Sequence, residues 1–397
     1  MKIDFVKEAE SIREEIIGLR REIHQNPELG DREFDTSRLI QAFLEKQGIE
    51  VETMLETAVV GVLRGAYPGK TVGFRADMDA LPIQEETGLP YASQKPGLMH
   101  ACGHDAHVAA VLGAAKLLAQ HRDELHGNVK FFFQPNEEGW GGAERMVAAG
   151  CMKNPDVDAV FGTHIVPGTP TGVFKVKGGN KYAASSLFEI TIHGKQTHGA
   201  APGAGIDPLV VGAQIILALQ TIVSRRCDVI NSPTLLTLTE FRYGDARYSI
   251  VSPEAKLCGM HRTFGIEKRE KVDALVREIA TGVAAANDAK AEVKITHGYA
   301  GVINHQRSAE LVARSARELF GDESIVEDVP GMGTEDFGYF ILEAEGAYYL
   351  SGARSPEVST VYPGHHGKYV IDEAAIPKMA ALHAQIAVNY LNEEAGK

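Results

Sequence analysis

Apolar residues follow two different rhythms along the chain. Up to about residue 180, short apolar runs such as VKFFFQP and DAVFGTHI alternate with helical patterns, for example at 38–46. Buried strands of parallel sheets read as continuous apolar runs, and their alternation with helices indicates a sheet that helices cover on both faces. We therefore predict an α/β fold with a mostly parallel sheet for this part of the chain.

The second rhythm covers residues 181–298. Its apolar segments are, in order, the strand LFEITIHG, the helix DPLVVGAQIILALQTIVSRR, the strands TLLTLTEF and AKLCGMHRTF, the helix KREKVDALVREIATGVAAAN and the strand AEVKITHG. This order, βαββαβ, is typical of a small ferredoxin-like α+β domain. The first rhythm then resumes. We predict that residues 181–298 form an insert in a discontinuous catalytic domain of residues 1–180 and 299–397.

Length and charge exclude several classes of protein. A chain of 397 residues usually forms about two domains. The net charge of −13, without a cluster of Lys or Arg, argues against a nucleic-acid partner. Charges interrupt the apolar stretches of residues 1–24, which predicts an amphipathic helix there instead of a signal peptide. No apolar run reaches the roughly 20 residues of a membrane helix. The 4 cysteines lack paired spacing, which favours a reducing, cytoplasmic location.

Polar side chains follow several predicted strands at their carboxyl ends, where open α/β sheets bind ligands. They are Asp77, Asp79, Glu137, Glu138 and His164. One carboxylate of a Glu pair at such a position can hold a metal while the other takes a proton from water. We expect these groups to converge on one rim of the sheet.

The densest cluster of reactive side chains is MHACGHDAH, at 99–107, directly before an apolar helical stretch. A helix N-terminus favours negative charge, so Cys102 can act there as a thiolate ligand, or as a nucleophile with His104 as its base. The loop PGHHGKY adds His365 and His366. Mixed imidazole, carboxylate and thiolate donors suit zinc, cobalt, nickel or manganese, and their number exceeds one tetrahedral site. We therefore expect two divalent metal ions.

Seven segments carry a family resemblance. They are RADMDALPI (75–83), MHACGHDAH (99–107), FQPNEEGWGGAERM (133–146), GTHIVPGTPTG (162–172), GKQTHGAAPGAGIDP (194–208), GTEDFGYF (333–340) and HHGKYVIDE (365–373). Together they resemble the signature segments of the zinc peptidase and aminoacylase family, in the branch of hippurate hydrolase, N-acyl-amino-acid amidohydrolases and indole-acetyl-amino-acid hydrolases. The resemblance spans nearly the whole chain in the same order.

The resemblance implies a specific set of site residues. The implied metal ligands are Cys102, His104, Glu138, His164 and His365, with Cys102 in the metal-bridging place. Glu137 becomes the general acid/base, and Asp79 orients the site from behind the ligands. His365 is preferred over His366 because the family loop reads His, variable, Pro, although Gly367 stands here in place of that proline.

The inserted domain is implied to serve as a lid and as a dimer interface. Its His198 would reach a site across a homodimer, or a higher homo-oligomer, and stabilise the oxyanion. Arg262 could clamp a substrate carboxylate with two hydrogen bonds. Trp140, the only tryptophan, either packs on the substrate or anchors its loop.

The expected activity is hydrolysis of the amide bond of an N-acyl or N-aroyl amino acid by a metal-activated hydroxide. A metal-dependent dipeptidase of the same family is the nearest alternative. A cysteine hydrolase that uses Cys102, and a small-molecule binding protein that has lost catalysis, are alternatives from other classes. A metal-free protein with full activity would exclude the two-metal account.

Overall fold

The computed structural model describes residues 3–139, 141–244, 248–356, 358 and 362–396. The chain divides into two compact units. The first comprises Met1–Lys181, Ile303–Val329 and Asp336–Lys397, and the second comprises Tyr182–Val302 and Pro330–Glu335. The sequence suggests a catalytic role for residues 1–180 and 299–397 and a lid role for residues 181–298, and both roles stay predictions.

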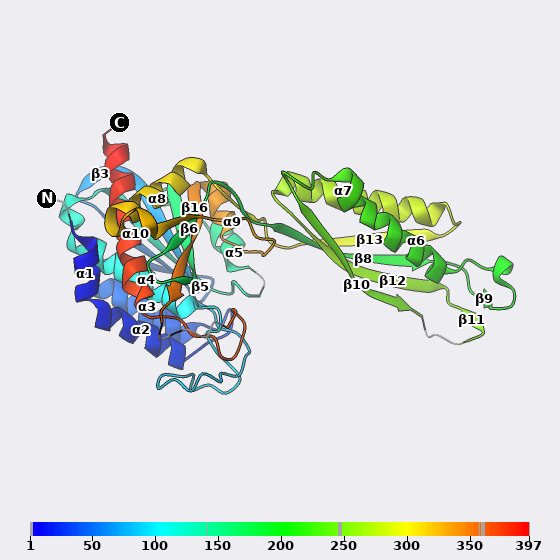
Figure 1. The fold of residues 1–397 in the computed structure, drawn as a ribbon, viewed down its shortest axis with the longest axis horizontal. Coiled ribbons are helices and arrows are strands. Elements are labelled where there is room, and N and C mark those ends of the chain that lie inside the picture. Colours follow the sequence, from blue (N-terminus) through cyan, green and yellow to red (C-terminus); the bar gives the residue numbers. More distant parts are fainter. Residues whose placement is uncertain (1–2, 140, 245–247, 357, 359–361, 397) are drawn as a thin grey trace. The chain divides into compact units, whose positions relative to one another are not determined.

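The first unit is built on an eight-stranded sheet in the order β1–β2–β4–β3–β5–β16–β6–β15 (Figure 1). The strands are β1 (Glu50–Met54), β2 (Ala58–Arg64), β3 (Tyr67–Asp77), β4 (His126–Gln134), β5 (Ala159–Pro170), β6 (Phe174–Val176), β15 (Ile325–Glu327) and β16 (Glu345–Arg354). The central strands β4, β3, β5 and β16 pair in parallel. Strands β1 and β2 add antiparallel pairs at one edge. The predicted fold class is confirmed.

Helices cover both faces of this sheet. They are α1 (Phe5–Ser11), α2 (Arg13–Gln25), α3 (Phe34–Lys46), α4 (His104–Gln120), α5 (Gly142–Ala148), α8 (Gln306–Phe320), α9 (Gly338–Glu343) and α10 (Ala375–Ala395), with 3-10 turns at Arg122–Glu124 and Asp322–Ser324. Strand β4 shows the two faces because successive side chains point to opposite sides. Phe132 contacts Phe340 of α9, whereas Phe131 and Phe133 join the core cluster that includes residues of α4 and α10.

The N-terminal segment departs from its prediction as one helix. Ile12, with φ −105° and ψ 8°, separates α1 from α2. Both helices still bury one face, with Phe5 in α1 and Ile16 in α2 completely inaccessible to solvent. The amphipathic pattern therefore predicted the buried face correctly but wrongly predicted one continuous helix. A break of one residue hardly shifts the apolar face, so the pattern does not reveal it.

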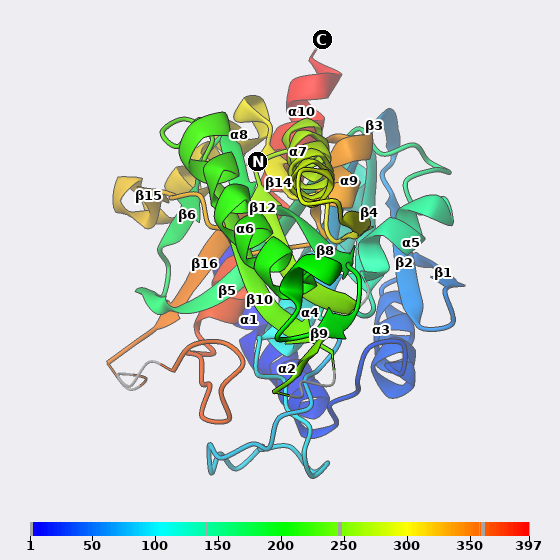
Figure 2. The ribbon, with the colours of Figure 1, turned by 90° about the vertical axis from the view of Figure 1, so that its right-hand side faces the viewer.

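The second unit has the predicted βαββαβ order. Its strands β8 (Ala184–His193), β10 (Thr234–Tyr243), β12 (Glu254–Thr263) and β13 (Lys290–His297) form an antiparallel sheet in the order β10–β12–β8–β13. Helices α6 (Pro208–Thr221) and α7 (Ile266–Ala285) lie side by side on one face of this sheet (Figure 2). Shorter elements are β9 (Thr197–His198), β11 (Ile250–Val251), a 3-10 turn at Pro202–Ala204 and a π-helical turn at Ile222–Arg226. Strands β7 (Gly179–Tyr182) and β14 (Val302–Asn304) lie where the chain passes between units.

One helical stretch in the described part of the chain, Pro208–Arg226, is long and apolar enough to cross a membrane by length and composition alone. Core helices of globular proteins can have the same length and composition, so one such stretch is weak evidence for a membrane-spanning helix. Its residues Val211, Ile215 and Leu219 are buried in the core of the second unit. The packing accounts for at least part of its apolar character.

Candidate metal centre

The carboxyl ends of the central strands bring the predicted side chains together. Asp77 is the last residue of β3, and Glu137 and Glu138 follow the end of β4 at Gln134. His164 was expected at a strand exit, but β5 continues to Pro170. The expectation was wrong because β5 keeps pairing with β16 after its last pair with β3, at Gly162. His164 lies just beyond that pair and so still reaches the same rim.

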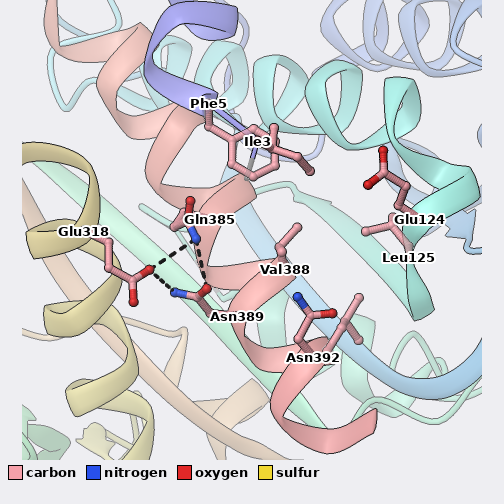
Figure 3. A pocket seen from close by; sticks show the side chains of 10 residues that line it. Ile3, Phe5, Glu124, Leu125, Glu318, Gln385, Val388, Asn389 and Asn392 are labelled. Carbon is pink, nitrogen blue, oxygen red and sulfur yellow. Dashed lines mark hydrogen bonds between the residues drawn. The ribbon is translucent and has the colours of Figure 1, made fainter. Parts of the chain in front are cut away.

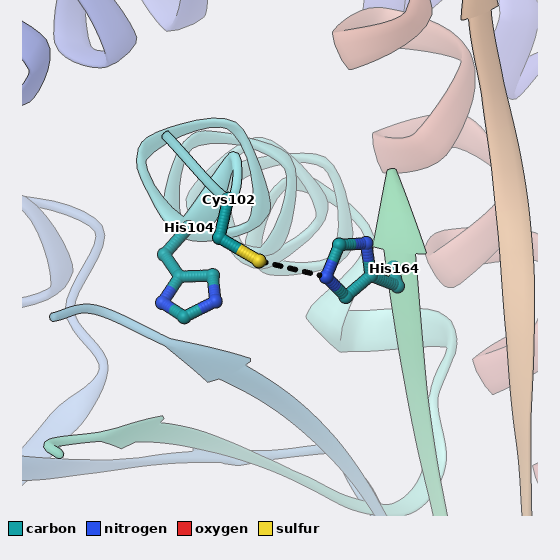
Figure 4. Close-up of side chains that lie close together, drawn as sticks. All are labelled: Cys102, His104 and His164. Atoms are coloured by element: carbon teal, nitrogen blue, oxygen red, sulfur yellow. Dashed lines mark hydrogen bonds between the residues drawn. The ribbon is translucent and has the colours of Figure 1, made fainter. Parts of the chain in front are cut away.

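The loop before α4 presents Cys102 to this rim. Gly103 adopts φ +92°, and a side chain there would meet Ile165 Cγ2 at 2.5 Å, so the turn requires glycine. Cys102 Sγ lies 3.2 Å from His164 Nε2, and the two side chains point toward one another in Figure 4. His104, the first residue of α4, completes a group of three ligand atoms that lie within 4.8 Å of one another. The loop thus delivers two donors and β5 delivers the third.

A second set of donors lies beside the first. Glu138 Oε1 is 3.0 Å from His365 Nε2 and 3.9 Å from His104 Nε2. Cys102, Glu138 and His365 form another group within 4.8 Å, as do His104, Glu137 and Glu138. Cys102 and His104 each belong to more than one group, which is the arrangement that two adjacent metal ions need.

The ring nitrogens that face away from the rim test whether a metal fits. His164 Nδ1 donates to the carbonyl of Ile165 at 2.7 Å, so its Nε2 carries no proton when the ring is neutral. His104 Nδ1 lies 2.9 Å from the Asp79 carbonyl and 3.2 Å from its carboxylate. Metal-binding histidines commonly donate their other N–H to such groups, which fixes the ring and leaves the second nitrogen for the ion. The donor set therefore fits divalent metal ions.

Burial sets the protonation of these donors. It lowers the pKa of His164 to about 3, which keeps the imidazole neutral and able to bind a metal. Burial raises the pKa of the Cys102 thiol to about 12 in the protein without a metal. Burial also acts to raise the pKa of Glu138, but the neighbouring His365 and His104 outweigh it and hold the pKa below its usual value. Glu138 is thus an anion at neutral pH.

The loop near the C-terminus distinguishes its two histidines. His365 has φ +65°, a rare conformation for a residue with a side chain, and its Nε2 faces Glu138. The neighbouring His366 stacks on Tyr362 and accepts a hydrogen bond from the Lys368 amide. The backbone therefore aims the first histidine at the rim, whereas the second one holds its own loop.

His107, another histidine of the MHACGHDAH segment, lies behind the candidate ligands. His107 Nδ1 is 2.6 Å from Asp77 Oδ1, and its Nε2 accepts a hydrogen bond from the Ile165 amide. Asp77 is also held by Arg75 at 2.5 Å, and Arg75 contacts Asp336 at 2.7 Å. His107 therefore has no ring nitrogen left for a metal.

Two of the remaining predicted site residues belong to the second unit. His198 is in β9 and Arg262 is in β12, both in the second unit. Ala200 donates to His198 Nδ1 at 3.0 Å, and Arg262 donates to the Met332 carbonyl at 2.5 Å. Trp140 lies outside the described residues. Their suggested roles stay predictions.

Sequence reasoning missed residues that hold the site from a distance. Glu33 accepts hydrogen bonds from the Asn136 amide and from Thr57, both at 3.0 Å. Asp336 accepts from Arg75, Gln134 and the Ala143 amide. Glu33 had no local signal, whereas Asp336 stands in the GTEDFGYF segment and could have been noticed there.

A cavity of about 380 Å³ lies elsewhere in the first unit, between α1, α8 and α10 (Figure 3). Three of its polar side chains bind one another: Asn389 and Gln385 donate to Glu318 at 2.8 and 3.3 Å. None of the predicted site residues lines it. We assign it no ligand.

Three comparisons place these features among known proteins. Residues 73–389 match the model of peptidase family M20/M25/M40. Thermostable carboxypeptidase 1 of Saccharolobus solfataricus is 39% identical, over 95% of this chain and 96% of its own. Hippurate hydrolase of Campylobacter jejuni is 36% identical, over 98% and 100%. A crystal structure from Bacillus subtilis, described as a dinuclear metal-binding peptidase of the M20 family, superimposes with a TM-score of 0.85 at 34% identity, covering 96% and 99%.

Proposed function

We propose that this chain, which belongs to peptidase family M20/M25/M40, hydrolyses the amide bond of N-acyl or N-aroyl amino acids. The observation that carries the proposal is the convergence on one rim of five candidate metal ligands, of which Glu138 is one, with the carboxylate of Glu137 beside them. A relative named hippurate hydrolase, which matches at full length, supports the substrate class.

The proposed ligands are Cys102, His104, Glu138, His164 and His365. Bound divalent ions would supply Lewis acidity, which polarises a carbonyl and lowers the pKa of water. Asp79 orients His104 through its carbonyl and carboxylate. With the ligand roles assigned in this way, Glu137, which is next to the proposed ligand Glu138, does not bind a metal.

Glu137 is proposed to move the proton. It is largely buried, and its carboxylate lies within 4.8 Å of a ligand atom of His104 and of Glu138. A carboxylate at that place can accept a proton from the attacking water and deliver it to the leaving amine. The chemistry needs no other titratable side chain at the same step.

Residues of the second unit are proposed to act on the substrate. Arg262 has a planar guanidinium that suits a free carboxylate next to the amide. His198 is proposed to stabilise the oxyanion across a homodimer that forms through the second unit. Trp140, which belongs to the first unit, is proposed either to pack on the substrate or to anchor its loop. Sedimentation velocity measures whether the protein is a dimer in solution. A cytoplasmic location is likewise a proposal.

Peptide hydrolysis is the second candidate, favoured by the relative named thermostable carboxypeptidase 1. A carboxypeptidase or dipeptidase would use the same metal ligands and the same Glu137. Such a peptidase would differ from the proposed amidohydrolase only in accepting an aminoacyl group in place of a simple acyl group. The cysteine hydrolase has less support, since Cys102 lies in a ligand group with His164.

The test is a substrate panel. The protein is reconstituted with zinc, cobalt or manganese, and release of the free amino acid is measured from acetyl, benzoyl and indole-acetyl amino acids and from simple dipeptides. Turnover of the acyl amino acids is expected. Turnover of the dipeptides alone would replace the first candidate by the second, and no turnover of either would reject both.

A further inference from the structure

The turn that carries the two glutamates has an unusual backbone. Asn136 precedes Glu137 and adopts φ +55°. A residue with a side chain seldom takes this conformation, and it persists only where surrounding contacts hold it. The contacts that hold Asn136 come from the loop between α2 and α3, which the mechanism proposed above does not use.

Both amides that flank Glu137 are held by buried carboxylates. The Asn136 amide donates to Glu33 Oε1 at 3.0 Å, and the Glu138 amide donates to Asp79 Oδ2 at 3.0 Å. The two residues that flank Glu137 are thereby held through their backbone amides, which restrains the turn that carries Glu137.

The Asn136 side chain is enclosed as well. Its Nδ2 donates to Asp31 Oδ2 at 2.7 Å, and Asp31 accepts from Arg145 at 2.6 Å through its other oxygen. A β-carbon added to Gly30 or to Gly139 would lie 2.2 Å from Asn136 Oδ1. Two glycines therefore leave the space that this side chain fills.

Glu33 has no evident purpose in the fold alone. It is completely inaccessible to solvent, and within the described ranges no Lys, Arg or His lies at ion-pair distance from it. A buried carboxyl group without a cationic partner is unfavourable compared with an apolar side chain. It accepts hydrogen bonds from the Asn136 amide and from Thr57, and of these two only the first leads to the metal centre.

We propose that Glu33 and Asp31, with Gly30 and Gly139, form a clamp on Asn136 that positions Glu137 for proton transfer. This inference rests on the proposed function of Glu137. Glu33 is a positioning residue because it acts through the turn and does not touch the substrate. The clamp governs the chemical step more than substrate binding, because it fixes the residue that carries the proton.

Three variants test the role of Glu33. Glu33→Ala removes the acceptor for the Asn136 amide and should lower kcat about 10- to 100-fold, with KM within about threefold of the wild type. Glu33→Gln can still accept from the Asn136 amide and should keep most of kcat. Thr57→Val, the matched control, removes the other hydrogen bond to Glu33 and should lower Tm while leaving kcat unchanged. Equal losses of kcat in Glu33→Ala and Thr57→Val, or in Glu33→Ala and Glu33→Gln, would overturn the proposal.

A second test needs no substrate. Gly30→Ala should lower Tm because its methyl group overlaps the Asn136 side chain. In an Asn136→Gly background that side chain is absent, so adding Gly30→Ala should have no further effect on Tm. Equal Tm losses in the two backgrounds would refute the clamp. If this coupling is found while no acyl amino acid or dipeptide is hydrolysed, the clamp stands as a structural device and the proposed function fails separately.

Discussion

His107 joins two strands that carry the metal centre: its Nδ1 contacts Asp77 at the end of β3, and its Nε2 accepts from the amide of Ile165 in β5. Ile165 directly follows His164, a proposed metal ligand. Because the carboxylate and the amide use both ring nitrogens, the imidazole acts as a spacer of fixed length. The position of His164 therefore depends on a side chain that binds no metal.

Replacing that spacer should weaken metal binding. His107→Ala leaves the Asp77 carboxylate and the Ile165 amide without their partner, so we expect the free energy of unfolding to fall by about 1–3 kcal/mol. The zinc affinity should fall about 10- to 100-fold, as for other residues that orient ligands. Competition with a chromogenic chelator measures the affinity. His121→Ala, at the other end of α4, should leave the affinity unchanged.

Removal of the metal should abolish turnover. Dialysis against a chelator is expected to eliminate hydrolysis, and zinc, cobalt or manganese should restore it. Cys102→Ser should weaken the affinity for zinc, because serine replaces a thiolate by a poorer ligand. If the protein keeps its full rate after the metal has been removed, the residues proposed as metal ligands must have other roles. A cysteine hydrolase with Cys102 as its nucleophile would then be the better explanation.

Exchange of Glu137 separates proton transfer from metal binding. Glu137→Gln keeps the size of the side chain but cannot accept a proton, so kcat should fall by about 100- to 10,000-fold. The metal content, measured by atomic absorption, should stay that of the wild type. Loss of metal together with activity would show that Glu137 is a ligand.

The two adjacent histidines of the C-terminal loop should behave differently. His365→Ala removes the side chain that faces Glu138, so both zinc affinity and kcat should fall, the affinity by at least about tenfold. His366→Ala removes only the stacking on Tyr362 and should leave zinc affinity within about threefold. The reverse order of effects would move the ligand to His366.

Glu33 should make stability depend on pH. Burial raises its pKa from 4.5 to about 7 in the folded chain. The folded protein therefore binds a proton more tightly than the unfolded chain does. This contribution is fully present below pH 4.5 and is lost as the pH rises to about 7, which corresponds to roughly 3 kcal/mol. Glu33→Gln should remove this fall, and urea unfolding at pH 5 and pH 8 measures the difference. An unchanged pH dependence in the variant would mean that another group is responsible.

The sequence by itself determined the fold class and named the candidate donors. Apolar runs such as VKFFFQP define buried strands through local composition, and parallel strands end at a common edge. Asp77, Glu137 and Glu138 could therefore be placed on one rim before any coordinates were known.

Only the tertiary structure decided which groups hold those donors in place. Glu33 and Asn136 are 103 positions apart, and Arg75 and Asp336 are 261 apart. No periodicity or spacing links residues at such separations, because their contact depends on how the loops pack after the strands have paired. The same holds for His164: its identity was readable in the sequence, but its place inside β5 was set by pairing with β16, whose residues lie far along the chain.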